Sequence, residues 1–291
     1  MKLSYLSFSV ILALLLLPIF ITPYILKGLG INSNPSIMPV IPMTEQSLEK
    51  IGIYNVPILM YHSIDMFSKI SISDKNKEAA RNNRIPLSIL IQQLDILKNN
   101  KYNTISFSTL KQLISTNTRI PEKSVILTFD DGWADNYQAF LELKKRNQVG
   151  SFAIVSDFVD KPNRLSKDQL NQMIESGSEV INHSKSHSDL TKVSQKQLTQ
   201  EIETSKITLE QMLGISINTI VYPTGAFNTA VINEVENSKY QFGLTTNPPN
   251  KEKRPNSLLE LQRFRMQCES YKDPSTEKCV NLGGSFFKSL L

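Results

Sequence analysis

The sequence predicts an α/β fold in which parallel strands alternate with helices, preceded by a membrane-spanning helix. Three observations carry this prediction. After about residue 55, short apolar runs of strand length alternate with stretches whose apolar residues recur at helical spacing. Polar residues suited to chemistry follow the ends of several of those runs. An uncharged apolar segment lies near the start of the chain. Repeated β-then-α units favour a parallel sheet with helices outside it, either open or closed into a barrel.

The first 27 residues are expected to form a signal anchor or a signal peptide. Residues 3–26 carry no charge, and a helix of that length reaches about 36 Å, enough to cross a hydrocarbon core of about 30 Å. A cleaved signal peptide is the alternative, but no A-x-A-like site follows and the run is long for such a peptide. We therefore favour a membrane anchor. Both interpretations place the rest of the chain outside the cytoplasm.

Residues 28–55 are expected to be a tether, and residues 56–291 the folded domain. The tether carries several Gly, Pro and Asn residues with little apolar periodicity. For the whole chain, 40% hydrophobic and 20% charged residues exclude general disorder. The net charge is only +5, without a dense Lys/Arg stripe, which argues against nucleic acid as a partner. Cys268 and Cys279 either close a short disulfide loop in an oxidising compartment or remain unpaired thiols.

The expected strands are short apolar runs bounded by polar or turn residues. The run at 124–129 is apolar without a break, which is typical of a strand buried on both faces. The segment at 259–266 alternates instead. In chain order, the expected strands are 56–61, 102–107, 124–129, 151–155, 179–181, 219–222, 241–245 and 259–266.

The expected helices are marked by apolar spacing and by capping residues. Ser194 with Gln197 forms a capping box, and Gly214 stops that helix. A polar stretch at 63–84 is expected to be a long loop. The expected helices are 87–97, one capped by Ser108, 134–146, one from Ser166 to Gly177, 194–214, and one from Asn228 to about Lys239.

Three polar sets follow strand ends. Asp130 and Asp131 follow the strand at 124–129, and two adjacent carboxylates need a cation or a proton to coexist there. The alternative is a helix N-cap assisted by Asp135. His183 and His187 follow the next-but-one strand, and a pair four apart can point both rings at one metal, although two solvent-facing histidines also occur at this spacing.

The third set, residues 222–225 (YPTG), is a sharp turn that could present a backbone N–H or simply reverse the chain. In βα folds these strand ends meet on one face. A carboxylate plus two imidazoles gives three protein ligands, the number that a catalytic zinc keeps, and the second carboxylate stays free as a base. The residues alone therefore predict a metal-assisted hydrolase.

Residues 128–132 (TFDDG) followed by 183–190 (HSKSHSDL) resemble the polysaccharide deacetylases, the carbohydrate esterase family 4 or NodB-homology group. The likeness extends through residues 60–64, 165–181 and 221–228, and covers essentially 56–265. The resemblance implies a distorted (β/α) barrel of about seven parallel strands. It also implies a divalent metal, most simply Zn²⁺ with Co²⁺, Ni²⁺ or Mn²⁺ as alternatives, and an acetylated polysaccharide as the substrate.

The resemblance also implies roles for individual residues. Asp130 resembles the catalytic base, whereas Asp131, His183 and His187 resemble the metal ligands. Thr224 resembles the residue whose backbone N–H stabilises the oxyanion.

Two family features are replaced in this chain. Most members have an arginine where this chain has Val221, and many have a late histidine as general acid, but no histidine follows His187. In the subgroup that acts on poly-β-1,6-N-acetylglucosamine, which this chain resembles in residues 61–62 and 222–225, a first-strand histidine takes the acid's place. That histidine is His62 here, and the alternative is a partly buried structural residue. Arg263 is expected to orient Asp130.

Aromatic residues near these motifs are candidates for sugar binding. We expect Trp133 and Tyr222, with Pro223 beside the latter, to contact substrate, the alternative being rim or core aromatics. The predicted reaction is removal of acetyl groups from an N-acetylglucosamine polymer. An O-acetyl esterase of the xylan type and a sugar-binding homologue without catalysis are the rival functions.

Overall fold

The computed structural model describes residues 45–64, 84–246, 257–266 and 285–288. The predicted membrane segment at 1–27, most of the predicted tether and both cysteines lie outside this part of the chain. Within the described residues, no helix combines the length and the apolar character needed to cross a membrane.

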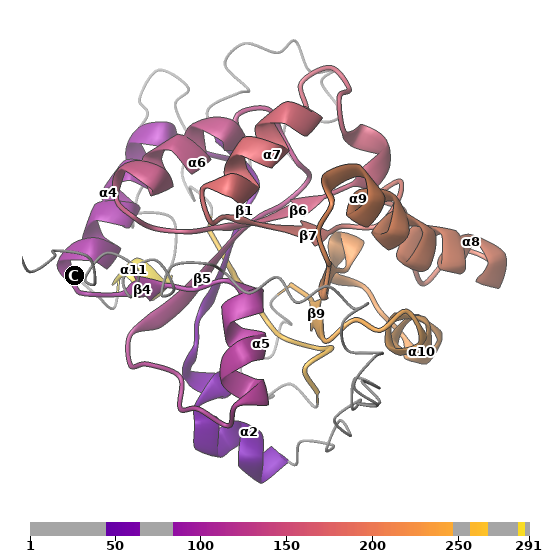
Figure 1. Cartoon of the computed structure of the whole chain (residues 1–291), viewed down its shortest axis with the longest axis horizontal. Coiled ribbons are helices and arrows are strands. Elements are labelled where there is room, and N and C mark those ends of the chain that lie inside the picture. The colour runs from indigo at the N-terminus through magenta and orange to yellow at the C-terminus, as the bar shows by residue number, and fades with distance from the viewer. Residues whose placement is uncertain (1–44, 65–83, 247–256, 267–284, 289–291) are drawn as a thin grey trace, which may run out of the picture. The chain divides into compact units, whose positions relative to one another are not determined.

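A curled parallel sheet forms the centre of the fold (Figure 1). This confirms the predicted parallel α/β architecture. Every described pairing in it is parallel, and β4 (Asn103–Thr104) adds to the amino-terminal half of β5. A separate pair, β2 (Ser63–Ile64) and β3 (Arg84–Ile85), flanks the segment predicted as a loop. The strand order is β10 (Phe264–Arg265), β1 (Ile58–Tyr61), β5 (Ser124–Phe129), β6 (Ser151–Ile154), β7 (Glu179–Asn182), β8 (Thr219–Val221) and β9 (Phe242–Leu244).

The segment 257–266 connects the two edges of this sheet. Leu261 bridges to Leu244 of β9, and Phe264 pairs with Leu59 of β1. Gly243 lies so close to this segment that a Cβ added there would stand 2.4 Å from the Leu259 carbonyl oxygen. The alternating stretch that we predicted as one strand is therefore two short pairings, one to each edge.

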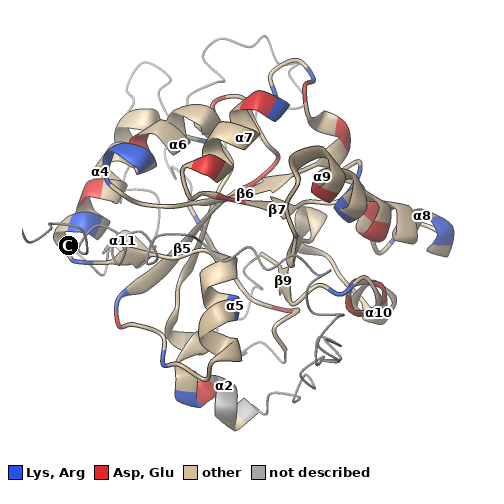
Figure 2. Cartoon of the chain, in the orientation of Figure 1, with Lys and Arg blue, Asp and Glu red and all other residues tan. Residues whose placement is uncertain are grey.

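Helices cover the outside of the sheet, and charged residues of both signs lie on them and on the connecting loops (Figure 2). Ser166, Ser194 and Asn228 cap their helices as predicted. The cap of α5 is Ser106 and not Ser108, because the Ser106 hydroxyl accepts the Thr109 N–H. The helices are α4 (Leu87–Asn99), α5 (Phe107–Ser115), α6 (Asn136–Lys145), α7 (Lys167–Glu175), α8 (Gln195–Thr199), α9 (Ser205–Leu213), α10 (Thr229–Asn237) and α11 (Ser285–Lys288).

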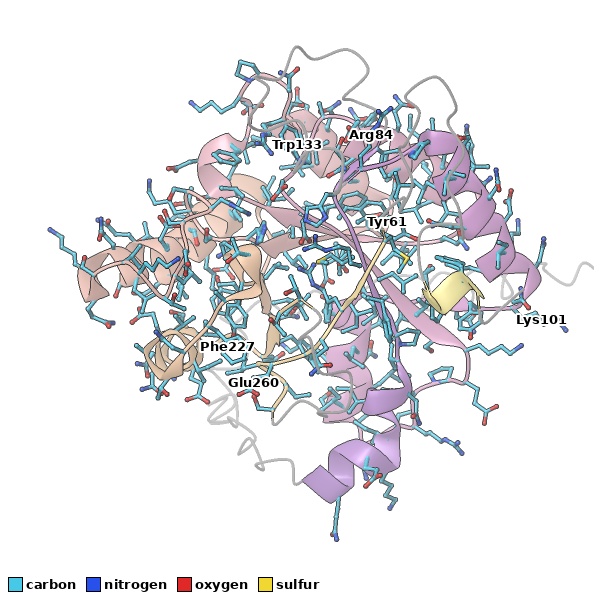
Figure 3. All side chains as sticks on the ribbon, turned by 180° about the vertical axis from the view of Figure 1, so that it is seen from behind. Tyr61, Arg84, Lys101, Trp133, Phe227 and Glu260 are labelled. Atoms are coloured by element: carbon cyan, nitrogen blue, oxygen red, sulfur yellow. The ribbon has the colours of Figure 1, made fainter. Side chains whose placement is uncertain are left out.

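The core is centred on β5, whose six residues are all buried. Phe129 stacks on Tyr61 of β1 and Phe152 of β6, with ring centroids 5.0 and 4.9 Å apart. Tyr61 lies in the middle of the molecule in Figure 3. Such stacked aromatics fix the neighbouring strands laterally, because each pair adds about 0.5–1.5 kcal/mol beyond its buried area.

The packed unit begins before residue 56, where we predicted the domain to start. Helix α2 (Glu45–Ile51) and the 3₁₀ turn Ile53–Asn55 occupy the end of the predicted tether. Ile51 and Ile53 are buried, and the Ile51 carbonyl accepts the Ile120 N–H at 2.9 Å. Two isoleucines within a Gly- and Pro-rich stretch are too few to show periodicity, which explains why the sequence did not predict this helix.

Glu179, at the amino-terminal end of β7, joins three elements. One carboxylate oxygen accepts the N–H of Phe107 at 2.8 Å and the hydroxyl of Ser151 at 3.0 Å. The other accepts the N–H and hydroxyl of Ser108 at 2.9 and 2.5 Å. The carboxylate therefore satisfies the first N–H groups of α5 and matches the positive end of its dipole.

We expect Glu179→Ala to lower the free energy of unfolding by about 2–3 kcal/mol, the scale of one or two charge-assisted hydrogen bonds. Glu175→Ala is the control, because this nearby glutamate is exposed on α7 and should change stability by no more than about 0.5 kcal/mol. Urea unfolding of both variants measures the difference. Equal stability of the two variants would contradict the role given to Glu179.

Candidate metal and acid–base site

Asp131, His183 and His187 come together at the carboxyl edge of the sheet. Asp131 follows β5, and the two histidines lie in the loop after β7. The Asp131 Oδ1 atom lies 3.4 Å from Nε2 of His183 and 3.3 Å from Nε2 of His187. In the described part of the chain, this is the group of acidic and histidine side chains arranged to hold a metal ion.

The distances from the Asp131 oxygen to the two histidine nitrogens fit a divalent cation. Ligands at about 2.0–2.1 Å from a tetrahedral centre lie about 3.3–3.4 Å from one another. The donor set, two imidazoles and one carboxylate, is a set that zinc uses in catalytic sites. The residues therefore fit the metal that the sequence predicted.

Neighbouring groups orient the three candidate ligands. Nδ1 of His183 lies 2.9 Å from the Val221 carbonyl oxygen of β8, so Nδ1 carries the proton and Nε2 keeps a lone pair. Nε1 of Trp133 donates to Oδ2 of Asp131 at 3.1 Å. Burial would raise the pKa of Asp131, but its hydrogen bonds with His183 and His187 lower this pKa well below its usual range. Asp131 is therefore ionised at neutral pH, as a metal ligand must be.

Arg164 supports Asp131 from its backbone side. Its guanidinium donates to the Asp131 carbonyl oxygen at 2.7 Å. It also lies 3.6 Å from the ring centroid of Trp133 and 4.4 Å from that of Phe158. This contact matters because Asp131 has a φ of 73°, a left-handed conformation that a non-glycine residue adopts at a cost.

Asp130 points in another direction and pairs with Arg263. The two guanidinium nitrogens donate to the two carboxylate oxygens at 2.7 and 2.8 Å, and both side chains are almost fully buried. Arg263 also donates to Oγ1 of Thr128 and to the carbonyl oxygen of Thr245, at 3.0 and 3.1 Å. The structure thus places Arg263 against Asp130, as the resemblance predicted.

This pair keeps Asp130 ionised. Burial alone would raise the pKa of Asp130, but the charge of Arg263, together with the charges that His183 and His62 have when protonated, lowers it below its usual value. A carboxylate that is ionised, oriented and next to a candidate metal site is suited to accept a proton from water.

His62 lies at the same edge of the sheet, directly after β1. Its Nε2 is 3.9 Å from Oδ2 of Asp130, and its Nδ1 is buried with no hydrogen-bond partner among the described residues. Burial lowers the pKa of His62, an effect that Asp130 and Asp131 oppose and that Arg263 reinforces. The ring is therefore neutral in the resting protein at neutral pH.

The turn after β8 places two of its predicted site residues in the core. Tyr222 has no exposed surface and donates its hydroxyl hydrogen to the Leu259 carbonyl oxygen at 2.8 Å, so its ring has no face for a sugar. Pro223 is also buried. The prediction that these residues bind substrate is not supported, because an apolar run of strand length does not show which of its residues are buried. Thr224 is exposed at the turn with a φ of 59°.

Trp133 lies toward the rim of the molecule (Figure 3). One ring face is covered by the Arg164 guanidinium, and its N–H is used by Asp131. The stacking on sugar that we predicted for Trp133 is therefore restricted to the other face.

A cavity of about 500 Å³ lies at the opposite end of the sheet from this site. It is lined by residues at the start of β1 and β5, including Val56 and Ser124, and by α2. Since the residues of the Asp–His cluster follow the carboxyl-terminal ends of β5 and β7, this cavity is separate from that cluster.

Arg164 and Glu201 are residues of this region that the sequence did not predict. Glu201 accepts hydrogen bonds from the loop between His183 and His187. Neither residue belongs to a local motif, because each acts on a partner at least 15 positions away in the chain. A single sequence carries no signal of that kind.

Comparison with known proteins agrees with this geometry. A family model described as polysaccharide deacetylase matches residues 117–243, a segment that contains Asp130, Asp131 and both histidines of the cluster. YxkH of Bacillus subtilis, named as a candidate polysaccharide deacetylase, is 28% identical over 212 residues, which cover 72% of this chain and 71% of that protein. The peptidoglycan-N-acetylglucosamine deacetylase PgdA of Listeria monocytogenes is 28% identical over 157 residues, covering 50% and 32% respectively.

A solved structure has the same fold. The deacetylase PplD of Streptococcus pyogenes, in complex with acetate, matches with a TM-score of 0.62 and 28% sequence identity. The match covers 73% of this chain and 92% of that one.

We expect Arg263→Met to lower the free energy of unfolding by about 3–5 kcal/mol at pH 7, because it leaves Asp130 buried and unpaired. The lowered pKa of Asp130 contributes stability above about pH 4, its unfolded pKa, and this contribution is lost as the pH falls through the folded pKa. The difference from wild type should therefore shrink toward pH 3. Arg119→Met, which alters an exposed ion pair, is the control. Urea unfolding at pH 7, 5 and 3 gives the comparison, and a difference that does not depend on pH would contradict it.

Proposed function

We propose that the chain, whose residues 117–243 match a polysaccharide deacetylase family model, is a metal-dependent hydrolase that removes acetyl groups from an N-acetylated polysaccharide. The observation that carries the proposal is the juxtaposition of two sets at one edge of the sheet. Asp131, His183 and His187 form the candidate metal site, and Asp130, held by Arg263, lies beside it as an ionised base. A protein that only bound sugar would need no such arrangement of ligands and base.

The reaction requires water to attack the acetamide carbonyl and the C–N bond to break. A divalent cation held by Asp131, His183 and His187 would polarise the carbonyl and lower the pKa of the attacking water. Asp130 accepts a proton from that water as the new C–O bond forms. Arg263 keeps both Asp130 oxygens in place and keeps this carboxylate ionised before the reaction.

His62 is the proposed donor of the proton that the leaving amine needs. It is the remaining histidine of the chain once two are assigned to the metal, and its Nε2 faces Asp130. Only protonated His62 can donate this proton. Burial lowers the pKa of His62, so the protonated fraction is small at neutral pH and falls as the pH rises. The products are acetate and a glucosamine unit.

Thr224 and Trp133 are proposed to act on the substrate. The proposed role of the Thr224 N–H is to stabilise an oxyanion, and it is supported by the position of Thr224 shortly after β8, whose Val221 carbonyl contacts His183. Trp133, whose N–H is bonded to Asp131, is proposed to contact a sugar. The named activity of PgdA on peptidoglycan makes a cell-wall glycan one candidate substrate, beside a free N-acetylglucosamine polymer. We also propose that residues 1–27 hold the domain at the outer face of a membrane.

The experiment that tests this function measures released acetate. We expect zinc-loaded protein to release acetate from at least one of chitooligosaccharide, poly-N-acetylglucosamine and peptidoglycan, and chelation to abolish that release until Zn²⁺ is restored. Acetylxylan, whose acetyl groups are O-linked, is the fourth substrate and distinguishes O-deacetylation from N-deacetylation. Release from acetylxylan alone would replace the proposed substrate class, and release from none of the four would contradict the function.

Two variants distinguish the proposed base, Asp130, from the proposed metal ligand, Asp131, in the same assay. Asp130→Asn should keep its zinc and lower the rate by about 10²–10⁴-fold, since a general base is lost. Asp131→Asn should instead lose zinc. Melting temperature is the control, because Asp130→Asn gives Arg263 a neutral partner. If Asp130→Asn lost its zinc while Asp131→Asn kept it, the two roles would be reversed.

The pH dependence tests His62. We expect kcat/KM to fall as the pH rises through the pKa of His62, which burial places below its ordinary value of 6.5. His62→Ala should lower the rate about 10²–10⁴-fold and remove this alkaline limb, with unchanged zinc content. If kcat/KM of this variant fell by less than about tenfold, or still declined at alkaline pH as in the wild type, His62 would be a structural residue.

A further inference from the structure

The helix that follows the histidine loop is interrupted by a π-helical segment. This segment, Gln200–Thr204, separates α8 from α9, and the sequence predicted one regular helix here. Segments of this kind are rare and are frequently found at functional sites. This one is located where the helix contacts the loop that carries His183 and His187.

Glu201 makes this contact. One carboxylate oxygen accepts the N–H groups of Lys185 and Ser186, at 2.9 and 2.8 Å. The other accepts the Ser186 hydroxyl at 2.5 Å. Lys185 and Ser186 are residues between the two histidines, and Glu201 is only 7% exposed. The carboxylate therefore fixes the chain that connects the two candidate ligands.

The π segment also holds the chain just before the first histidine. Asn182 precedes His183 and donates to Oγ of Ser205 at 2.7 Å and to the hydroxyl of Tyr240 at 2.5 Å. Ser205 in turn donates to the Glu201 carbonyl oxygen at 2.6 Å. The same stretch of helix thus fixes the loop on both sides of His183.

The loop requires such support because of its backbone. Ser184 and His187 have φ values of 65° and 64°, the left-handed region that non-glycine residues adopt only at an energetic cost. Conformations of this kind persist only where the surroundings determine them. The hydrogen bonds that Glu201 accepts stabilise these conformations, together with the bond from the His187 N–H to Oγ of Ser184 at 3.0 Å.

We propose that Glu201 is a positioning residue that holds His183 and His187 at the separation a divalent cation requires. The proposal rests on the proposed function, because it takes these histidines as metal ligands. Glu201 is not itself a ligand, since both of its oxygens are used by the loop. The expected consequence of its loss is a weaker metal site in a folded protein.

The test measures zinc affinity by competition with a chromophoric chelator. We expect Glu201→Ala to raise the Kd for Zn²⁺ about 10- to 100-fold, the usual effect of losing an outer partner of a metal site. Glu201→Gln should fall between this variant and wild type, because its carbonyl oxygen can still accept from Lys185 and Ser186. The visible absorption of bound Co²⁺, which reports ligand geometry, should change in Glu201→Ala.

Glu179→Ala is the matched control, because Glu179 also joins backbone N–H groups and serine hydroxyls but lies at the other end of β7. Its Kd should stay within about twofold of wild type. An unchanged Kd in Glu201→Ala, or an equal rise in Glu179→Ala, would overturn the proposal. If Glu201→Ala does not fold, the Kd of Glu201→Gln is compared with those of wild type and Glu179→Ala, and an unchanged value overturns the proposal. A wild-type protein that binds no zinc would overturn the proposed function itself, which distinguishes the two failures.

Discussion

The buried ion pair between Asp130 and Arg263 connects the fold to its chemistry. Asp130 follows the central strand β5, and Arg263 comes from the segment that joins the two edges of the sheet. Two charges removed from water are tolerated only when their hydrogen bonds are satisfied, and here Thr128 and Thr245 complete the set around the guanidinium. The same interaction therefore positions the last strand, orients a carboxylate and keeps it ionised next to a candidate metal site.

The adjacent aspartates show how one turn divides two roles. Asp130 continues the direction of β5 and faces Arg263, whereas Asp131 adopts a left-handed conformation and faces two histidines. The hydrogen bond from Arg164 stabilises the left-handed backbone at Asp131, and the hydrogen bonds that Glu201 accepts stabilise the backbone of the histidine loop. Each candidate ligand thus depends on a buried or stacked polar side chain behind it, which is how metal sites are usually held in place.

Local patterns predicted the parts of this fold that depend on local physics. The strand at 124–129 was recognised because both of its faces are buried, and the caps at Ser166 and Ser194 act within one helical turn. The Asp and His motifs were recognised because the carboxyl ends of parallel strands must meet. Glu179 and Glu201, whose partners are distant in sequence, gave no signal. Tyr222 was predicted to contact substrate but is buried, and the π segment has a sequence typical of an ordinary helix.

The central claim is that Asp131, His183 and His187 hold one divalent cation beside Asp130. A crystal structure of the zinc-loaded protein, with anomalous data collected at the zinc edge, tests it most directly. The account predicts one strong anomalous peak about 2.0–2.2 Å from Oδ1 of Asp131 and from Nε2 of each histidine, with Asp130 still paired to Arg263. A peak elsewhere in the molecule, or a peak that Asp130 ligates in place of Asp131, would contradict it.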